Sequence, residues 1–179
     1  DLRSFKGGSA QTKDILVDSI TSVYLYTDEF NSKQTYASVH DENGRFYIRN
    51  LDYHDASTNS DYATVYFSLS TSLEVKGSIY VVGGFNDFQR TENNRLSYNH
   101  DSKLWEVNLL LKQGLYDYKY VLEDEKGTLY PTTFSGSHWE TGNDYQIIVY
   151  YRRTGTYWDE ILGIKNISTN AYRIRTLNN

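Results

Sequence analysis

The sequence contains no cysteine, no methionine and only one proline among its 179 residues. Without cysteine the chain can form neither disulfides nor zinc–thiolate sites, and it has no thiol nucleophile. No apolar run approaches the roughly 20 residues of a membrane-spanning helix, so we expect no transmembrane segment. The 18 basic residues are outnumbered by 23 acidic ones and are scattered along the chain. This distribution argues against nucleic acid as a partner, because such a partner requires a clustered basic surface.

Tyrosine, by contrast, is abundant, with 18 copies, and apolar and polar residues alternate along much of the chain. The alternation is clearest in two segments, whose apolar positions are Trp105, Val107, Leu109 and Leu111 in the first and Tyr116, Tyr118, Tyr120 and Leu122 in the second. A period of two residues predicts half-buried antiparallel strands. The short connection Lys112-Gln113-Gly114 predicts that the two strands form a tight hairpin.

Similar strand signals recur about every 8 to 12 residues, and no helical period extends over roughly ten residues. The further predicted strands are 22–27, 34–39, 45–49, 63–70, 78–82, 129–130 and 145–151. Short, regularly spaced strands of this kind favour a sandwich. The sequence therefore predicts an all-β fold: an immunoglobulin-like (E-set) antiparallel β-sandwich, preceded by strands of a second β domain.

Polar residues crowd the segment 56–61, and we place a domain boundary there. On this division residues 1–61 are the C-terminal part of the preceding β domain, with a hairpin at Asn43-Gly44. Residues 62–151 form the sandwich, and residues 152–179 are a C-terminal extension. The chain begins abruptly at Asp1, without an initiator Met or a secretory leader, so we expect a mature or excised portion of a longer protein.

Motifs that would indicate catalysis are absent from the sequence. It contains no Gly-x-Ser-x-Gly, no Walker loop and no His-Glu-x-x-His. Glu106 and Asp117 fall on the polar faces of two strands predicted to be neighbours, where paired carboxylates could exchange protons. Lys103 and Lys119 fall on the same surface, so solvated ion pairs are the more ordinary outcome. The sequence predicts no enzyme and no cofactor.

Three His-Asp dipeptides are the best candidates for metal ligands: His40-Asp41, His54-Asp55 and His100-Asp101. Imidazole and carboxylate are both good ligands, but the three pairs would have to converge in space. Each pair lies in a predicted turn, where an Asp side chain commonly hydrogen-bonds nearby backbone. We therefore interpret them as turn residues and predict no metal site.

Several large aromatic residues lie near strand ends or in predicted loops: Phe85, Phe88, Trp105, Trp139 and Trp158. Lys119 and Asn143 lie on adjacent segments, and aromatic faces with a few polar groups suit a sugar ring. The strand phase of Trp105 instead predicts a core position, and Phe85 is expected to pack under the bend at residues 83–84. Phe88, Trp139 and Trp158 stay open, either as sugar-binding aromatics or as part of a protein-docking patch.

Residues 78–151 resemble the E-set glycogen-binding module, carbohydrate-binding family 48. The resemblance lies in V-x-G-G-F-N-D-F, in W-E-V-N-L-L-L-K-Q-G-L-Y-D-Y-K-Y-V-L-E-D and in the later G-N-D-Y. It implies a sandwich and a glycan site in which Phe88 replaces a stacking Trp, with Lys119 and Asn143 as matching polar residues. The family's second stacking Trp has no counterpart near residues 126–129.

A longer resemblance runs from Asp1 to about Gly163. It lies in the segments D-L-R-S-F, D-E-N-G-R-F-Y-I, A-T-V-Y-F-S-L, G-S-H-W-E-T-G-N-D-Y-Q-I-I-V-Y-Y-R and D-E-I-L-G, in this order. By these segments the chain resembles the C-terminal portion of the type IX secretion system plug protein family of Bacteroidota. The resemblance implies a non-enzymatic periplasmic protein, associated with the outer membrane, that closes the periplasmic opening of the translocon barrel while no substrate is crossing.

We therefore expect an accessory of type IX secretion whose partner is the outer-membrane translocon barrel. The loops 83–94 and 134–143 are the expected contact surface, because they are rich in aromatic residues and predicted to be exposed. The alternative hypothesis is a glycan-binding module that uses Phe88, Lys119, Trp139 and Asn143. A third hypothesis is an interaction domain for another envelope protein.

Overall fold

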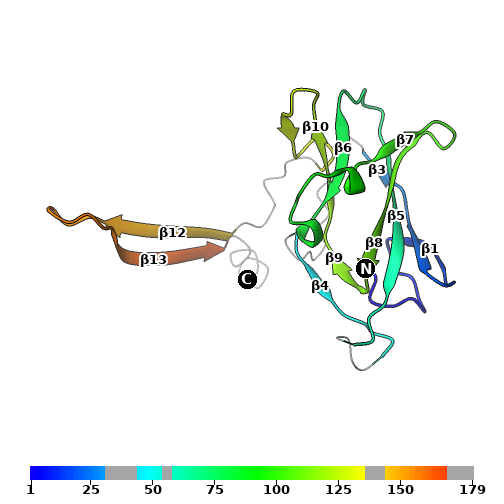
Figure 1. Cartoon of the computed structure of the whole chain (residues 1–179), viewed down its shortest axis with the longest axis horizontal. Helices are drawn as coiled ribbons and strands as arrows, with labels where there is room; N and C mark the ends of the chain where they lie inside the picture. Colours follow the sequence, from blue (N-terminus) through cyan, green and yellow to red (C-terminus); the bar gives the residue numbers. More distant parts are fainter. Residues whose placement is uncertain (31–43, 54–57, 136–143, 169–179) are drawn as a thin grey trace, which may run out of the picture. The chain divides into compact units, whose positions relative to one another are not determined.

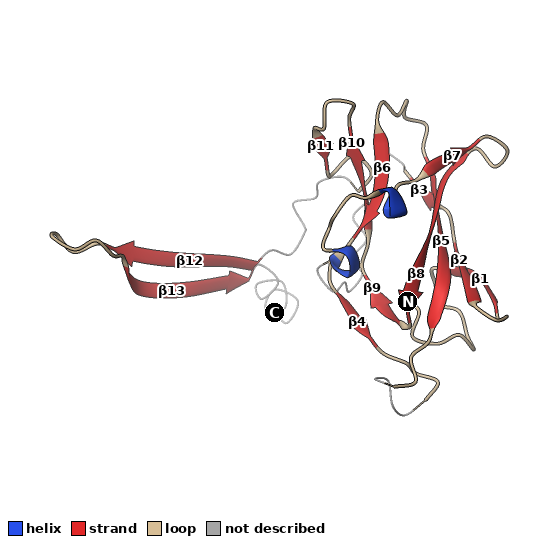
Figure 2. Ribbon diagram, in the orientation of Figure 1, coloured by secondary structure: helices blue, strands red, loops and turns tan. Residues whose placement is uncertain are grey.

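The computed structural model of the protein describes residues 1–30, 44–53, 58–135 and 144–168. Its contacts divide the chain into two compact units, Asp1–Ser137 and His138–Asn179, and each is described by itself. Within the described residues the regular structure is β, apart from two short 3₁₀ turns (Figure 2). No helix in this part of the chain is long and apolar enough to cross a membrane. The predicted all-β class is confirmed.

The larger sheet of the first unit has the strand order β1-β2-β5-β8-β7, and β3 also pairs with β5 (Figure 1). The strand bounds are β1 Thr12–Leu16, β2 Thr21–Leu25, β3 Asp28–Glu29, β5 Tyr62–Ser70, β7 Ser97–Asn99 and β8 Leu104–Lys112. Along β5, buried and partly exposed residues alternate from Ala63 to Ser70. Alternation of this kind places one side of the sheet on the core and the other toward solvent.

A smaller sheet, in the order β11-β10-β6, lies across the core from the larger one. Its strands are β6 Ser78–Val82, β10 Lys119–Glu123 and β11 Leu129–Tyr130. The core combines side chains from both sheets: Val23, Leu25, Val65, Phe67 and Leu69 from the larger, and Ile79, Val81 and Tyr120 from the smaller. Two sheets that share one apolar core make this unit a β-sandwich.

Both alternating faces predicted from the sequence pack against this core. The residues in contact with it include Trp105, Val107, Leu109 and Leu111 from the first face and Tyr116, Tyr118, Tyr120 and Leu122 from the second. The core position predicted for Trp105 is therefore confirmed. A period of two residues correctly identified which side chains turn inward.

The tight hairpin predicted at residues 112–114 is wrong. β8 pairs with β5 and β7, whereas the following β9 (Gly114–Tyr116) pairs with β4 (Phe46–Ile48), and β10 pairs with β6. Gly114 serves close packing rather than a turn, since a Cβ there would lie 2.5 Å from the Tyr47 carbonyl oxygen. The chain thus passes from one sheet to another at this point, and the two alternating segments are not neighbours.

Gln113 fills this crossing point as a buried polar residue. Its Oε1 accepts hydrogen bonds from Asn50 Nδ2 at 2.9 Å and from the Asp61 N–H at 3.0 Å. Asn50 Nδ2 also donates to the Asn59 carbonyl at 2.6 Å, and the Gln113 N–H donates to the Asp61 carbonyl at 2.8 Å. Because every one of these groups has a partner, the network fixes the segments on either side of residues 54–57 without an unsatisfied polar group.

The domain boundary predicted at residue 61 does not separate two domains in the structure. β2, which precedes it, pairs in parallel with β5, which follows it. Leu2 and Val23 also share one core with Val65. The polar composition of this segment reflects a connection within one unit, and the division between units falls after Ser137. The larger sheet is mixed rather than purely antiparallel, since β2 and β3 both run parallel to β5; the immunoglobulin-like (E-set) assignment stays a prediction.

The turn predicted at His100-Asp101 is confirmed, since residues 100–103 connect the antiparallel pair β7 and β8. A second turn, residues 124–128, connects β10 and β11. In the second turn, Asp124 Oδ1 accepts from the N–H groups of Lys126 and Thr128, and Gly127 takes a φ of 79°. The predicted strand 34–39 and Asn43 of the predicted hairpin lie outside the described residues.

The second unit contains an antiparallel hairpin of β12 (Asp144–Tyr151) and β13 (Glu160–Ser168). The strand predicted at 145–151 is confirmed, but its predicted place within the sandwich of residues 62–151 is wrong. In the described part of the chain β12 pairs with β13 alone. The predicted C-terminal extension therefore supplies the partner strand, which local sequence patterning could not indicate because pairing is set by tertiary context.

Candidate functional site

The loop after β6 is held by hydrogen bonds between side chains and backbone. Asn86 Oδ1 accepts from the Gly83 N–H at 3.0 Å, and its Nδ2 donates to the Val81 carbonyl at 3.1 Å. Asn94 is buried and donates from Nδ2 to the carbonyls of Val81 and Gln89, at 2.8 and 2.9 Å. These bonds span the 3₁₀ turns η1 (Gly84–Asn86) and η2 (Glu92–Asn94) and define one loop conformation.

This loop displays Phe88 in an unfavourable backbone conformation. Phe88 has a φ of 55° and follows Asp87 with a φ of 51°, both in the left-handed region that a bulky aromatic rarely adopts. Its side chain is nevertheless 47% exposed, with the ring edge resting on Gly44. Backbone strain clusters at binding and catalytic sites, so Phe88 is a candidate contact residue.

Lys119 lies at the same end of the smaller sheet as Phe88. It is the first residue of β10 and is paired with Val82, the last residue of β6. Gly83 follows Val82 directly, and the Phe88 N–H donates to the Gly83 carbonyl at 3.0 Å. The structure thus brings these two predicted site residues to one region. Trp139 and Asn143 lie outside the described residues, so the predicted four-residue site is placed only in part.

The other aromatic residues separate into two groups. Phe85 packs its ring against Tyr116 at a centroid distance of 5.9 Å, in agreement with its predicted place under the bend. Trp105 contacts the core and lies 5.3 Å from the Tyr98 ring. Trp158, by contrast, is 61% exposed in the second unit. It remains a candidate for contact with a partner.

The β12–β13 hairpin exposes large apolar side chains on both of its faces. Seven of them in the two strands are at least 50% exposed. By strand alternation and register, Tyr145, Ile147 and Val149 lie on one face and Tyr150, Ile161 and Ile164 on the other, and Leu162 lies at the register shift between them. An isolated two-stranded hairpin is marginally stable in water. Contiguous exposed apolar surface of this kind marks a site of interaction.

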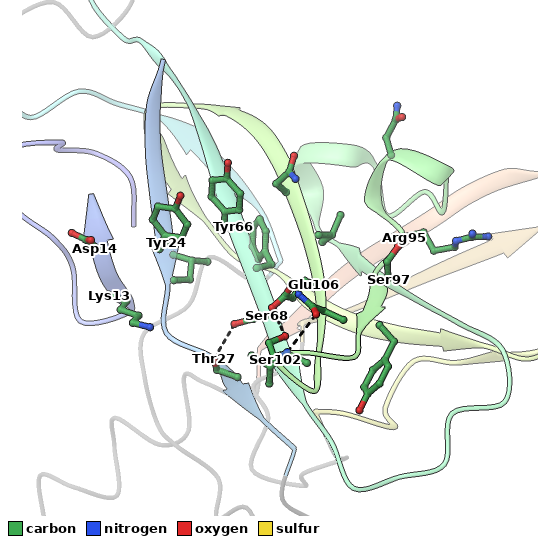
Figure 3. Close-up of a pocket in the computed structure, with 18 of the residues that line it drawn as sticks. Lys13, Asp14, Tyr24, Thr27, Tyr66, Ser68, Arg95, Ser97, Ser102 and Glu106 are labelled. Atoms are coloured by element: carbon green, nitrogen blue, oxygen red, sulfur yellow. Dashed lines mark hydrogen bonds between the residues drawn. The ribbon is translucent and has the colours of Figure 1, made fainter. Parts of the chain in front are cut away.

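A groove of about 980 Å³ crosses the outer face of the larger sheet (Figure 3). Its lining comes mainly from β1, β2, β5, β7 and β8, with Thr27, Asn93, Arg95 and Ser102 from the segments between strands. In it Tyr24 and Tyr66 stand side by side, directly paired between β2 and β5, with ring centroids 4.4 Å apart and planes only 10° from parallel. Desolvation, with the neighbouring Tyr66, raises the pKa of Tyr24 above its ordinary value. This surface therefore combines a stacked aromatic pair with a hollow of ligand size.

A group of polar side chains lies in the same groove, to one side of the stacked tyrosines. Ser68 Oγ donates to Thr27 Oγ1 at 3.0 Å, and Glu106 accepts from Ser102 Oγ at 2.8 Å and from Asn99 Nδ2 at 2.9 Å (Figure 3). Sequence patterning missed this surface. The available signal was a Tyr in the outward phase of two separate strands, but only the register places the two rings together.

The candidate acid–base pair is not assembled. Glu106 lies in β8 of the larger sheet, bonded to Asn99 and Ser102, whereas Asp117 lies between β9 and β10 and accepts from the Gly44 N–H at 3.1 Å. Glu106 and Asp117 stay apart because the predicted hairpin, which would have made their strands neighbours, does not form.

The His100-Asp101 pair lies in the β7–β8 turn, where the Asp101 N–H donates to Asn99 Oδ1 at 3.0 Å. Its predicted role as a turn is confirmed, and residues 40–41 and 54–55 lie outside the described residues. Across residues 1–30, 44–53, 58–135 and 144–168, no cluster of three or more His, Cys, Asp or Glu could hold a metal ion.

Comparison with known proteins gives a structural relative. No protein-family model and no curated protein matches the chain. The chain is similar to the crystal structure of a hypothetical protein from Parabacteroides merdae ATCC 43184, with a TM-score of 0.78 and 31% sequence identity. The match covers 93% of this chain but 43% of the other, so this chain spans less than half the length of that relative. The likeness supports the fold.

Proposed function

We propose that this chain is a non-enzymatic periplasmic accessory of type IX protein secretion that closes the periplasmic opening of the outer-membrane translocon barrel. The observation that carries the proposal is the β12–β13 hairpin. Its two apolar faces are unfavourable in water, and a protein wall that covers them would recover the free energy of burying that surface. The resemblance of residues 1–163 to the plug protein family gives the identity of that wall.

The sandwich suits this role because a stopper gains affinity from rigidity. When the shape is fixed before binding, the loss of conformational entropy at the contact is small. The loop 83–94, held by Asn86 and Asn94, is rigid in this sense and presents Phe88 to solvent. Loop and hairpin are thus two candidate contacts, and Trp158 adds a third exposed aromatic.

Co-purification tests the proposal in a bacterium that carries the secretion system. The tagged full-length protein is expected to recover the translocon barrel under gentle extraction, and Ile147→Asp with Ile164→Asp is expected to reduce recovery at least about tenfold by charging both apolar faces. Asn166→Asp is the matched control, since it adds a charge at a hairpin position that is already polar. Failure to recover the barrel, or equal recovery with the double variant, would contradict the proposal.

Closure has its own readout. A cell whose stopper is displaced is expected to admit a large polar antibiotic through the open pore. The double hairpin variant should therefore raise sensitivity to vancomycin, and Asn166→Asp should not. Unchanged sensitivity in cells that lack the protein altogether would argue against a plugging role.

A glycan-binding module is the second candidate, favoured by one observation. Phe88 is exposed and strained, and Lys119 lies at the same end of the smaller sheet. Calorimetry with maltoheptaose separates the candidates. Millimolar or tighter binding that is lost in Phe88→Ala, and kept in Tyr62→Ala at an exposed aromatic residue elsewhere, supports the glycan module. Absence of binding counts against it.

A further inference from the structure

We propose that the groove on the outer face of the larger sheet binds an uncharged oligosaccharide, at a site distinct from Phe88 and Lys119. The groove is lined by residues of β1, β2, β5, β7 and β8 and of the segments next to them, and it contains the Tyr24–Tyr66 stack (Figure 3).

The first argument is the free surface of the two rings. Stacking occupies one face of Tyr24 and one face of Tyr66, so each ring keeps its other face. The strand register puts Asp14 beside Tyr24 and Asn108 beside Tyr66. Both flanking side chains are shorter than the rings, and both rings remain partly exposed. A free aromatic face is the surface on which the C–H face of a sugar packs.

The second argument is the hydrogen-bonding capacity next to each ring. Asp14 uses Oδ1 to accept from the Ile15 N–H at 2.8 Å, and its carboxylate is exposed. Asn108 is also exposed, and within the described part of the chain no residue hydrogen-bonds its amide. A carboxylate beside one ring and an amide beside the other together offer acceptors and donors, which is what the hydroxyls of a sugar require.

The third argument is charge. The groove contains two basic and two acidic side chains, Lys13, Arg95, Asp14 and Glu106. Arg95 forms an ion pair with Glu92 at 3.1 Å, and Glu106 is bonded to Asn99 and Ser102. Neither sign dominates the surface, so it offers no complementarity to a strongly anionic or cationic ligand. An uncharged ligand fits this balance.

The fourth argument is size. A volume of about 980 Å³ is at the upper end of the range of ligand sites. The row from Asp14 through Tyr24 and Tyr66 to Asn108 crosses three strand spacings. At about 4.8 Å per spacing this row extends over roughly 14 Å. The groove therefore suits a short run of sugar units rather than a single one.

Calorimetry with a panel of neutral hexasaccharides tests the inference: cello-, xylo-, manno-, malto- and chito-oligosaccharides, each compared with hexagalacturonate as a charged probe. At least one neutral sugar is expected to bind with a millimolar or tighter Kd and more tightly than the charged probe. Tyr66→Ala and Tyr24→Ala are each expected to weaken it about tenfold. Tyr62→Ala is the matched control, because Tyr62 lies on β5, is 55% exposed and does not line the groove.

Any of three results with sugars would overturn the inference: no binding by any neutral sugar, preference for hexagalacturonate, or binding that is lost in Phe88→Ala and unchanged in Tyr66→Ala. Binding of unstructured peptides that depends on Tyr66, with no sugar bound, would also overturn it. If Tyr66→Ala lowers the thermal unfolding midpoint, Asn108→Ala tests the same groove through an exposed side chain. These outcomes do not affect the plug proposal, which the hairpin variants test.

Discussion

The Tyr118 hydroxyl donates a hydrogen bond of 2.7 Å to Oδ2 of Asp28, although the two residues are 90 positions apart. The Tyr120 hydroxyl donates to the same oxygen at 2.9 Å. Burial raises the pKa of Asp28 above its ordinary value, and the two hydroxyl donors offset only part of this effect. Burial, together with the Asp28 carboxylate, also raises the pKa of Tyr118 and of Tyr120, so both remain donors at neutral pH.

We predict that Asp28 makes the protein less stable as pH rises. Its folded-state pKa lies above the unfolded value of about 3.9, so over this interval the folded state holds a proton that the unfolded state has released. The contribution is therefore complete below the unfolded pKa and is lost as pH rises through the folded pKa. Asp28→Asn removes this titration.

Urea unfolding of both proteins between about pH 4 and pH 8 measures the effect as a difference. The comparison cancels the contribution of Asp52. Burial raises the pKa of Asp52, but hydrogen bonds from Ser4 and Phe5 outweigh it, so the net pKa is lowered. The comparison also cancels Asp124, whose pKa is lowered mainly by the Thr128 N–H. Because both pKa values are lowered, the stability that these two carboxylates contribute to the fold is lost as pH falls. Parallel profiles for the two proteins would show that Asp28 does not titrate as predicted.

Gln113→Leu is expected to lower the free energy of unfolding by about 2–4 kcal/mol, because buried donors lose their acceptor. The Asp61 N–H loses its bond to Oε1, and of the two bonds donated by Asn50 Nδ2 only the one to the Asn59 carbonyl remains. Gln146→Leu in β12 is the control, since Gln146 is exposed. Its effect should stay within about 0.5 kcal/mol. Equal effects for the two variants would mean that the buried network contributes little.

Phe88→Gly is expected to be more stable than Phe88→Ala by up to about 1 kcal/mol, because only glycine adopts a positive φ without strain. Phe85 gives the matched comparison, since it lies three positions earlier in a 3₁₀ turn with an ordinary φ. There the order should reverse, with alanine more stable than glycine. Thermal or urea unfolding of the four variants decides it, and the same order at both positions would show that Phe88 carries no strain.

Hydrogen exchange is expected to differ sharply between the two units. Amides of β5, which is paired on both sides within the sandwich, should exchange slowest. Amides of β12 and β13 should exchange fastest among the strands in the isolated chain, because a lone hairpin opens readily. Addition of the translocon barrel should slow the hairpin amides selectively. Protection of β12 equal to that of β5 without any partner would mean that the hairpin is already covered.

Periodicity in the sequence predicted the strands better than their neighbours. β6 has the predicted bounds, β5 begins one residue earlier than predicted, and β8 extends one residue beyond the predicted alternation at each end. Alternation identifies which side chains are buried, but it contains no information on which strand lies alongside. Two predictions failed in this way. The hairpin predicted at Gln113 does not form, and the predicted antiparallel pairing is contradicted by the parallel pair β2 and β5.

The candidate sites follow the same division. Phe88 was identifiable because an aromatic residue in a Gly- and Asn-rich bend is a local signal. The Tyr24–Tyr66 pair and the Asp28 cluster were not, because each forms only when distant segments meet. Residues 139 and 143 stay predictions.

The parallel pairing of β2 with β5 also limits how this fold can be inherited. A fragment that begins at Tyr62 would lack β2, so one edge of the nine-residue strand β5 would have no partner from β2. Bare strand edges recruit other chains and lead to aggregation. The sandwich therefore cannot be transferred between genes as an independent domain that starts at residue 62. A recombination that preserves it must include residues 1–30, which contain β1, β2 and β3.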